Sequence, residues 1–281
     1  MNIQWFPGHM AKTRRMISEN IGLCDCVAEI VDARCPQSSR NPELPGLSRN
    51  KKSFIIINKC DLADPVQTEK WQRRFAAAGL VSVCTNSNDG KGVAKITDAA
   101  RETMAEQIER NKARGLVNKP LRIMVCGIPN VGKSSLINKL SGKASAKVGD
   151  KPGVTRGRQW ITLKSGIELL DTPGILWPKL EDKEAALRLA FTGAIRDEIL
   201  DVEELACELC SFLKENYPAA LEQRYRAVLT PEMNGLETLE EICRRRGFIV
   251  KGGEIDLLRG ANVVLDEFRG GKLGRITVEL P

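Results

Sequence analysis

Gly127-Ile-Pro-Asn-Val-Gly-Lys-Ser-Ser135 lies between a short apolar run, Leu121-Arg-Ile-Met-Val-Cys126, and a helix-like segment, Ser135-Leu-Ile-Asn-Lys-Leu140. Strand, glycine loop and helix in this order are the setting of a phosphate-binding loop. Two glycines let the backbone turn tightly, so that its N–H groups point at phosphate oxygens, and the helix N-terminus adds a favourable dipole. The stretch therefore predicts an α/β fold built around a nucleotide phosphate site.

The side chains of this loop have expected roles. Lys133 would reach the β- and γ-phosphates, and the Ser134 hydroxyl would hold Mg²⁺. The nucleotide-binding prediction also includes the other residues of the turn and the helix start: Asn130, Val131, Gly132 and Ser135. The alternative is a glycine-containing loop without a ligand, and the flanking strand and helix argue against it.

A second motif, Asn58-Lys-Cys-Asp61, follows the clearest strand pattern in the chain, Ser53-Phe-Ile-Ile-Ile57. An unbroken apolar run of this kind is typical of a strand buried on both faces, as in a parallel sheet. Asp61 can accept two hydrogen bonds from the N1–H and the N2 amino group of guanine, a donor pair that adenine lacks. Asn58 can tie the motif to neighbouring loops, and the Lys59 stem can lie on the base plane.

A further strand pattern, Leu80-Val-Ser-Val-Cys84, leads into a polar loop, Thr85–Gly92. Its position matches a loop whose backbone touches the guanine O6. We expect Asn86 and Ser87 to lie there, although the sequence of this loop is permissive.

Two segments after the phosphate loop complete the predicted site. Lys151-Pro-Gly-Val-Thr155 lies in a basic loop, where the Thr155 hydroxyl could bind Mg²⁺ when a γ-phosphate is present and release it after hydrolysis. Residues 159–164 and 167–170 are predicted to form a hairpin over Ser165-Gly166, and its second strand leads into Asp171-Thr-Pro-Gly174. Asp171 would hold Mg²⁺ through water, and the Gly174 N–H would meet the γ-phosphate.

The order of these motifs is unusual. In ordinary GTPases the phosphate loop comes first and the guanine motif near the end, whereas here Asn58–Asp61 and the O6 loop precede Gly127–Ser135. The same parts in rotated order indicate a circular permutation, which a compact domain tolerates when its termini lie close together. The segment that senses the γ-phosphate, Asp171–Gly174, then leads directly into the C-terminal region and can act on it.

Charge is unevenly distributed. The 281-residue chain has a formal net charge of +7, with 28 Lys/Arg against 16 Asp/Glu in residues 1–178 and 15 against 20 in residues 179–281. Basic residues are dense after the first helix of the phosphate site: Lys139, Lys143, Lys147, Lys151, Arg156 and Arg158. Such a surplus favours a polyanionic partner such as RNA, and the alternative is a set of solvated lysines that maintain solubility.

Composition narrows the class of protein. No apolar run reaches the roughly 18–20 residues that a membrane span needs, and the N-terminus has no signal-peptide pattern. Nine cysteines are scattered along the chain without a His/Cys cluster, which is typical of a reduced cytosolic protein with buried thiols rather than a zinc protein. We expect no membrane span, a cytoplasmic location and a monomer.

The chain resembles the circularly permuted GTPases, most closely the ribosome biogenesis GTPase A branch. Besides the motifs above, the resemblance rests on Trp5-Phe-Pro-Gly-His-Met10, on Asp32-Ala-Arg-x-Pro36 with Ser39-Arg-Asn-Pro42, and on Pro152–Thr155. It is strong over about residues 1–180 and looser beyond. It implies a GTPase that uses GTP, GDP and Mg²⁺, binds the rRNA and proteins of the immature large ribosomal subunit, and assists its late assembly.

The resemblance also bears on hydrolysis. Many GTPases orient the attacking water with a glutamine after Asp-x-x-Gly, but here that position is Ile175. The family assigns this task to the histidine that corresponds to His9, so the expected catalytic residues are His9, Lys133 and Thr155; the alternative is a histidine that packs the N-terminal segment or contacts rRNA. Asn130 matches a position that coordinates K⁺ in related GTPases, and its alternative is a hydrogen bond within the loop.

Residues 181–281 are predicted to form a small all-helical domain after a GTPase domain at 1–180. Asp201 is a good N-cap, and the stripe that follows has helical spacing: Val202, Leu205, Ala206, Leu209, Phe212 and Leu213. Gly235–Arg246 and Glu254–Phe268 suggest two further helices. Arg244-Arg-Arg246 opens a basic end and is the candidate rRNA contact of this domain.

Two other functions stay open at this point. In one, the chain is a nucleotide-gated RNA-binding module in which GTP hydrolysis is incidental. In the other, it is a metabolic P-loop kinase, which the guanine motif Asn58–Asp61 and the lack of a second-substrate site argue against.

Overall fold

The computed structural model describes residues 9–116, 119–142, 159–163, 165–177 and 182–281, with the backbone alone at 9–12 and 159. The described residues group into two compact units. We call residues 9–177 with 279–281 the α/β unit and residues 182–278 the helical unit. The last three residues of the chain thus belong with the unit that precedes the helices.

The α/β unit is built on a six-stranded sheet in the order β3-β2-β1-β4-β6-β5. All neighbours pair in parallel except β5 and β6, which form the predicted antiparallel hairpin. The strands are β1 (Cys26–Asp32), β2 (Ser53–Asn58), β3 (Ser82–Cys84), β4 (Leu121–Gly127), β5 (Gln159–Thr162) and β6 (Ile167–Asp171). The central strands β1, β2 and β4 are almost continuously buried, which explains their mainly apolar sequences.

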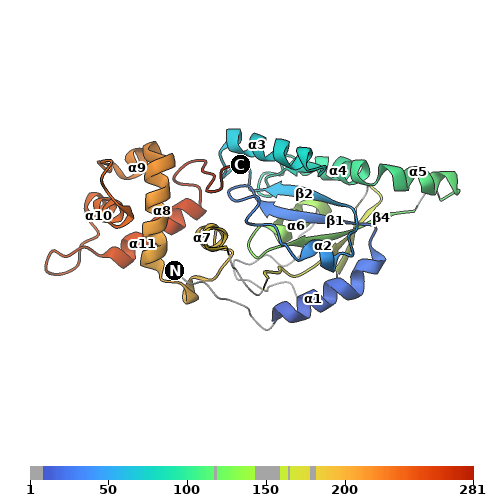
Figure 1. Ribbon diagram of the computed structural model, residues 1–281, viewed down its shortest axis with the longest axis horizontal. Helices are drawn as coiled ribbons and strands as arrows, with labels where there is room; N and C mark the ends of the chain where they lie inside the picture. The colour runs from blue at the N-terminus through green and yellow to red at the C-terminus, as the bar shows by residue number, and fades with distance from the viewer. Residues whose placement is uncertain (1–8, 117–118, 143–158, 164, 178–181) are drawn as a thin grey trace. The chain divides into compact units, whose positions relative to one another are not determined.

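Helices cover this sheet. Figure 1 shows α3 and α4 following one another along one side of the sheet, α5 continuing beyond them, and α1 on the opposite side. One core cluster joins α3 to the sheet: the rings of Trp71 and Phe75 pack with Val31, Ala33, Ile55, Ile57 and Ala63. The helices of this unit are α1 (His9–Asn20), α2 (Leu44–Leu47), α3 (Pro65–Ala77), α4 (Lys95–Thr103), α5 (Ala105–Ala113) and α6 (Lys133–Ser141).

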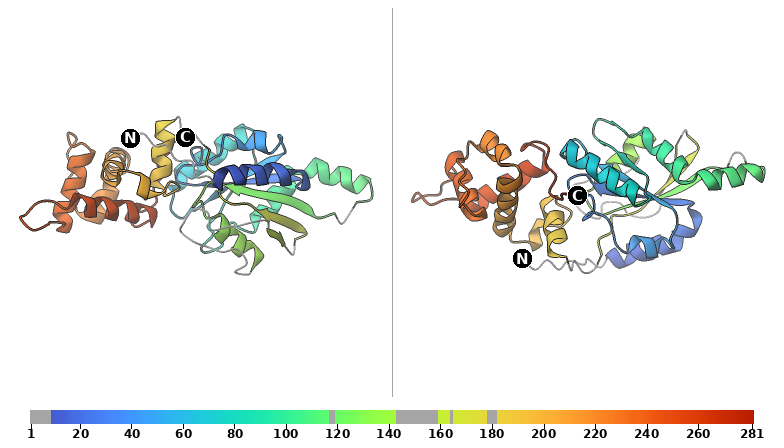
Figure 2. Two further views of the ribbon diagram at one scale, coloured as in Figure 1. Left: turned by 90° about the horizontal axis from the view of Figure 1, so that it is seen from below. Right: turned by 45° about the horizontal axis from the view of Figure 1, so that its top comes forward.

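The helical unit is formed by α7 (Lys183–Phe191), α8 (Val202–Asn216), α9 (Pro218–Tyr225), α10 (Gly235–Arg246) and α11 (Leu257–Arg269), which Figure 2 shows grouped together. The fold class expected from the sequence, a mostly parallel α/β sheet followed by helices, is confirmed. Asp201 caps α8 by accepting a hydrogen bond from the Glu204 N–H at 3.0 Å. Most of the predicted stripe is buried, with Val202 and Phe212 only half-buried.

The predicted helix at Glu254–Phe268 begins later than expected, at Leu257. Residues Ile249 and Ile255 pair in an isolated antiparallel bridge, which holds this part of the chain extended. The Asp256 side chain then accepts a hydrogen bond from the Arg259 N–H at 3.1 Å and fixes the start of the helix.

Gly260 provides a test of the packing between α10 and α11. A Cβ atom at Gly260 would lie 2.1 Å from the Cys243 Sγ, which is closer than real atoms approach. We expect Gly260→Ala to lower the free energy of unfolding of the helical unit by about 1–3 kcal/mol, although alanine is the better helix former. Thermal and urea unfolding measure this.

The double variant Gly260→Ala/Cys243→Ala serves as the control, because it removes the sulfur that meets the new methyl group. It should be more stable than the sum of the two single effects predicts. Additive effects would contradict this account of the packing.

Candidate nucleotide-binding site

The carboxyl ends of the parallel strands meet at one edge of the sheet and bring the predicted motifs together. Asp32 of β1 is in register with Asn58 of β2, and Ile30 of β1 is in register with Gly127 of β4. Chain connections run in opposite directions from the β1–β4 pair, because β2 and β3 extend the sheet on one side and β6 on the other. A switch point of this kind is where open α/β sheets bind ligands.

The phosphate loop is held by close backbone packing. Gly132 has φ 86° and precedes α6, and a Cβ there would lie 2.5 Å from the Asn58 Nδ2. At Gly127 a Cβ would lie 2.9 Å from the Ile30 carbonyl oxygen and 3.1 Å from a methyl of the buried Val131. Both glycines are therefore required by contacts and not only by the turn. Asn130 also has a left-handed backbone, with φ 61°.

Asn58 connects three segments that are distant in sequence. Its Nδ2 donates to the Val131 carbonyl at 2.8 Å, and its Oδ1 accepts from the Thr85 hydroxyl at 3.0 Å and the Ser87 hydroxyl at 2.8 Å. It is fully buried. One amide side chain thus joins the guanine motif to the phosphate loop and to the predicted O6 loop. Asn86 in that loop accepts from the Asn88 N–H at 2.9 Å through its own side chain.

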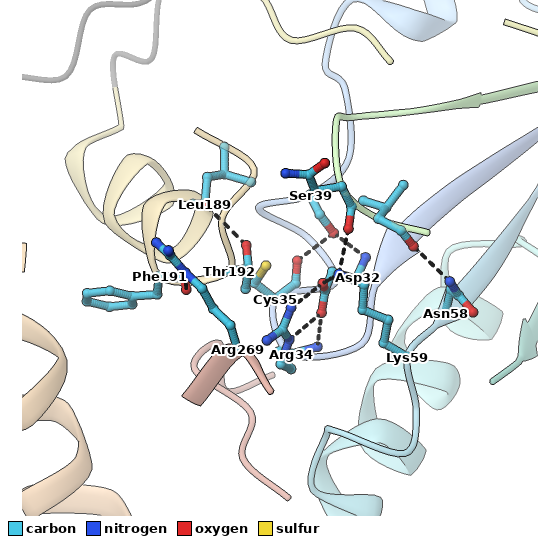
Figure 3. A network of polar contacts seen from close by, with 12 residues as sticks. Asp32, Arg34, Cys35, Ser39, Asn58, Lys59, Leu189, Phe191, Thr192 and Arg269 are labelled. Carbon is cyan, nitrogen blue, oxygen red and sulfur yellow. Dashed lines mark hydrogen bonds and ion pairs between the residues drawn. The ribbon is translucent and has the colours of Figure 1, made fainter. Parts of the chain in front are cut away.

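Lys59 has a left-handed backbone, with φ 62°, and its Nζ contacts two groups. It donates to the Asn130 carbonyl at 2.5 Å and lies 3.1 Å from the Asp32 carboxylate. Asp32 is also paired with Arg34, at 2.9 Å from Nε and 2.8 Å from a terminal guanidinium nitrogen, as Figure 3 shows. These contacts fix the Lys59 stem beside the phosphate loop.

Asp32 and Arg34 are both buried, with side chains only 2% and 1% exposed. Burial alone would raise the pKa of the Asp32 carboxyl, but the charges and hydrogen bonds of Arg34 and Lys59 hold it well below its ordinary value. Burial of the Lys59 ammonium lowers its pKa, which the Asp32 charge opposes. Asp32 therefore stays a carboxylate, held between the cationic side chains of Arg34 and Lys59.

Two carboxylate oxygens in the site are buried without a hydrogen-bond partner among the described residues: the Oδ1 of Asp61 and the Oδ2 of Asp171. The other oxygen of Asp171 lies 2.5 Å from the Nζ of Lys133, and both side chains are buried. An unpaired buried carboxylate oxygen is costly, so each marks a place where a ligand group fits. The acceptor at Asp61 suits the donor edge of a base, and the one at Asp171 suits a hydrated cation.

The segment after β6 is fixed against β4 and the phosphate loop. The Thr172 hydroxyl donates to the Val125 carbonyl at 2.8 Å, and the Ile175 N–H donates to the Gly127 carbonyl at 3.1 Å. A Cβ at Gly174 would lie 3.0 Å from the backbone of Pro129. Ile175 is fully buried, so the position that carries a glutamine in many GTPases is here part of the core.

Two residues of the predicted site lie wholly or partly outside what the structure describes. His9 begins α1, with only its backbone described, and Thr155 lies outside the described residues. The predicted Ser134 and Ser135 lie in the first turn of α6 and are half-buried. Three residues that sequence reasoning gave no role belong to the network around Asn58 and Lys59: Asp32, Arg34 and Thr85. The signal for Asp32 was a charged residue at the carboxyl end of a mainly apolar strand.

Comparisons with known proteins agree with this geometry. Residues 122–229 match the family described as 50S ribosome-binding GTPase. The chain is 46% identical to ribosome biogenesis GTPase A of Priestia megaterium and 44% identical to that of Bacillus pumilus, covering all of this chain and 98–99% of theirs. The chain belongs to the ribosome biogenesis GTPase A family. The expected family and the GTPase activity that goes with it are confirmed.

Solved structures of this family extend the comparison. The GDP-bound structure of a ribosome biogenesis GTPase A relative, Thermotoga maritima YlqF, has a TM-score of 0.67 and 26% identity over 95% of this chain and 99% of that chain. The GNP-bound T. maritima structure has a TM-score of 0.65. The circular permutation that the motif order implies is therefore the arrangement of a known family. Among the described residues, no helix has the length and apolarity to cross a membrane.

Asp32 provides a stability test of the site. Asp32→Asn removes the charge that balances the buried Arg34, so we expect a loss of about 3–5 kcal/mol in the free energy of unfolding. Denaturant unfolding at pH 7 measures it. The control is Glu19→Gln, which breaks the exposed Arg15–Glu19 pair and should cost less than about 1 kcal/mol.

The loss of stability in Asp32→Asn should become smaller as the pH falls. A carboxyl whose pKa is lowered in the folded protein contributes stability above its ordinary value of 3.8, and this contribution is lost as pH falls below that value. The difference between wild type and Asp32→Asn should therefore shrink below about pH 4. A small difference at pH 7, or one that grows in acid, would contradict the ionised pair.

Proposed function

We propose that this site binds GTP with Mg²⁺, that it hydrolyses the GTP, and that the protein thereby assists late assembly of the large ribosomal subunit. The observation that carries the proposal is the pair of unpartnered buried carboxylate oxygens at Asp61 and Asp171, at the guanine motif and beside the phosphate loop. Asn58 joins these two parts through hydrogen bonds. One nucleotide that spans from base to magnesium would satisfy both oxygens.

At the base end, Asp61 accepts the N1–H and N2 donors of guanine. The Lys59 stem, held by Asp32 and the Asn130 carbonyl, supports the base plane. Asn86 and Ser87 form the loop near O6, and Ser87 is anchored to Asn58. Adenine would leave the Asp61 carboxylate without donors, so the site selects guanine.

At the phosphate end, the loop backbone from Asn130 to Ser135 surrounds the phosphates, and Lys133 neutralises the β- and γ-oxygens. Ser134, Thr155 and Asp171 would hold Mg²⁺, which supplies charge compensation on the β- and γ-oxygens when it is bound. Lys133 and Asp171 already form an ion pair, so the residues assigned to the triphosphate and to the metal are neighbours. The Gly174 N–H meets the γ-phosphate, and Asn130 would hold K⁺ beside it.

Hydrolysis needs a group that orients the attacking water. Ile175 is apolar and buried and cannot do so. His9 is assigned this role, because a neutral imidazole can orient water or accept its proton near pH 7. It is the single histidine of the chain.

The partner of the protein is assigned from charge and from the family. Relatives are named for ribosome biogenesis, and the matching domain family for 50S ribosome binding. Arg244, Arg245 and Arg246 lie exposed in the last turn of α10 and provide a basic surface for rRNA. The protein acts as a cytoplasmic monomer that contacts rRNA and ribosomal proteins of the large subunit.

Asp61→Asn tests the base assignment. Xanthine carries a carbonyl where guanine carries the N2 amino group. The amide N–H of an asparagine at position 61 can therefore donate to the xanthine carbonyl, but it would face the N2 donor of guanine unfavourably. We expect binding of GDP to weaken by about 100-fold or more and binding of xanthosine diphosphate to strengthen. Titration calorimetry gives Kd for both nucleotides and so measures the change in base preference.

Asp64→Asn is the matched control, because Asp64 lies close to Asp61 in the sequence but caps α3 by accepting from the Val66 and Gln67 N–H groups. Its substitution should leave the base preference unchanged. An Asp61→Asn protein that still prefers GDP would refute the base assignment.

His9→Ala tests the hydrolysis assignment. Turnover stimulated by large ribosomal subunits should fall about 10²- to 10⁴-fold, the usual contribution of a general base, while GTP affinity stays the same. Arg15→Ala on the same helix, which breaks only an exposed ion pair, is the control. Full stimulated turnover in His9→Ala would show that another group orients the water.

A further inference from the structure

The end of the chain is bound into the α/β unit by a buried carboxylate. Glu279 is only 5% exposed. Its carboxylate accepts hydrogen bonds from the Gln37 N–H at 2.5 Å and from the Ser38 N–H at 2.9 and 3.0 Å, and it also binds the Ser38 hydroxyl. Two backbone donors and a hydroxyl that converge on one carboxylate form a specific anion site, since hydrogen bonds to a charged group are strong.

A second contact fixes the backbone of this segment. The indole Nε1 of Trp71 donates to the Glu279 carbonyl oxygen at 2.8 Å. Trp71 belongs to the core cluster that includes Val31 and Ile57, the residues that precede Asp32 and Asn58 in their strands. Through Trp71, Glu279 is therefore attached to the part of the sheet that carries the guanine motif.

The loop that Glu279 contacts is held at its other end by a second buried carboxylate. Glu29 of β1 accepts from the Arg40 Nε at 3.0 Å and from the Asn41 N–H at 2.9 Å. Residues 37–41 thus lie between one anchor from the sheet and one from the C-terminus. Only the C-terminal anchor depends on a segment far away in the sequence.

This loop leads to the nucleotide site through Ser39. The Ser39 hydroxyl accepts from the Asp32 N–H at 2.9 Å and donates to the Cys35 carbonyl at 2.7 Å (Figure 3). Asp32 in turn holds Lys59, whose Nζ reaches the phosphate loop at the Asn130 carbonyl. The connection therefore runs from Ser38 to its chain neighbour Ser39, from the Ser39 hydroxyl to the Asp32 backbone, and from the Asp32 carboxylate to Lys59, the residue assigned to the base plane.

We propose that Glu279 is a positioning residue for the guanine end of the nucleotide site, and that its carboxylate acts as a latch on the loop 37–41. The proposal rests on the proposed placement of the base against Lys59 and Asp61. Releasing the latch loosens Ser38 and Ser39, and with them the Asp32 carboxylate that orients Lys59. Val278, the preceding residue, belongs to the helical unit, so the latch is also where the chain returns from that unit.

The latch acts on a part of the site that GDP and GTP share. Its loss should therefore weaken both nucleotides by the same factor and leave the rate of hydrolysis of bound GTP unchanged. If Glu279 were a purely structural anchor, its loss would lower the melting temperature without an equal rise in Kd for GDP and GTP. The distinction gives the proposal a measurement beyond stability.

The test compares three variants of the full-length protein with wild type: Glu279→Ala, Glu279→Gln and Glu267→Gln. The last is the matched control, because Glu267 is equally buried but pairs with Arg224 within the helical unit. Hydrogen exchange is measured at the amides of Gln37 and Ser38, and Kd for GDP and GTP and single-turnover GTP hydrolysis are measured well below the melting temperature.

We expect Glu279→Ala to speed exchange at Gln37 and Ser38 and to raise Kd for GDP and for GTP about tenfold, a factor typical of losing a charge-assisted hydrogen-bond set. Glu279→Gln, which keeps one acceptor oxygen, should show a smaller rise in Kd. Single-turnover hydrolysis at saturating GTP should stay unchanged in both. Glu267→Gln should lower the melting temperature and leave Kd unchanged.

Three results would overturn the proposal: unchanged exchange at Gln37 and Ser38 in Glu279→Ala, faster exchange with unchanged Kd, or an equal rise in Kd in Glu267→Gln. The Asp61→Asn variant reports separately on the base assignment. If Asp61→Asn changes base preference while Glu279→Ala leaves Kd unchanged, the nucleotide site stands and only the latch fails. If Asp61→Asn leaves base preference unchanged, the base assignment itself fails.

Discussion

Parallel pairing of β1 with both β2 and β4 is the constraint on which the rest of the structure depends. This pairing places Asp32 beside Asn58 and Ile30 beside Gly127, so that the guanine motif and the phosphate loop leave the sheet at the same edge. Hydrogen bonds between strands depend on register and direction and not on the order in which the chain supplies the strands. The permuted order of motifs is therefore compatible with one intact site, which Asn58 joins through its bond to the Val131 carbonyl.

Charge is concentrated at this edge in compact buried groups. Asp32, Arg34 and Lys59 form one, and Lys133 with Asp171 forms another. Buried ion pairs contribute little net stability, because desolvation offsets much of their attraction. Their value here is geometric: they hold a lysine stem and a carboxylate in fixed orientations before a ligand arrives, which lowers the cost of ordering the site on binding.

Sequence reasoning predicted those parts of the fold and site whose signals are local. The phosphate loop, the guanine motif and the hairpin at β5 and β6 each combine an apolar strand with turn residues within a few positions. The predicted start of α11 was too early. The helical pattern of apolar residues does not show that the chain first forms an extended bridge between Ile249 and Ile255 and that the helix begins after it. The assignments of His9 and Thr155 stay predictions.

The parts that sequence reasoning missed depend on contacts between distant segments. Arg34 looks like a surface residue of a loop until β2 places Lys59 on the other side of Asp32. Glu279 is one acidic residue near the end of the chain, and nothing near it in sequence indicates that it meets Ser38, 241 positions away. Long-range pairs of this kind leave no periodicity, so only the folded chain reveals them.

The central claim is that one site recognises the guanine base and the phosphates together. Titration calorimetry of the wild-type protein with GDP, inosine diphosphate and ADP, in Mg²⁺, tests it most directly. Inosine diphosphate lacks only the N2 amino group, so it should bind more weakly than GDP. ADP should bind more weakly than either, roughly 1,000-fold or more below GDP, because adenine leaves the Asp61 carboxylate without donors. Equal affinity for GDP and ADP would contradict the account.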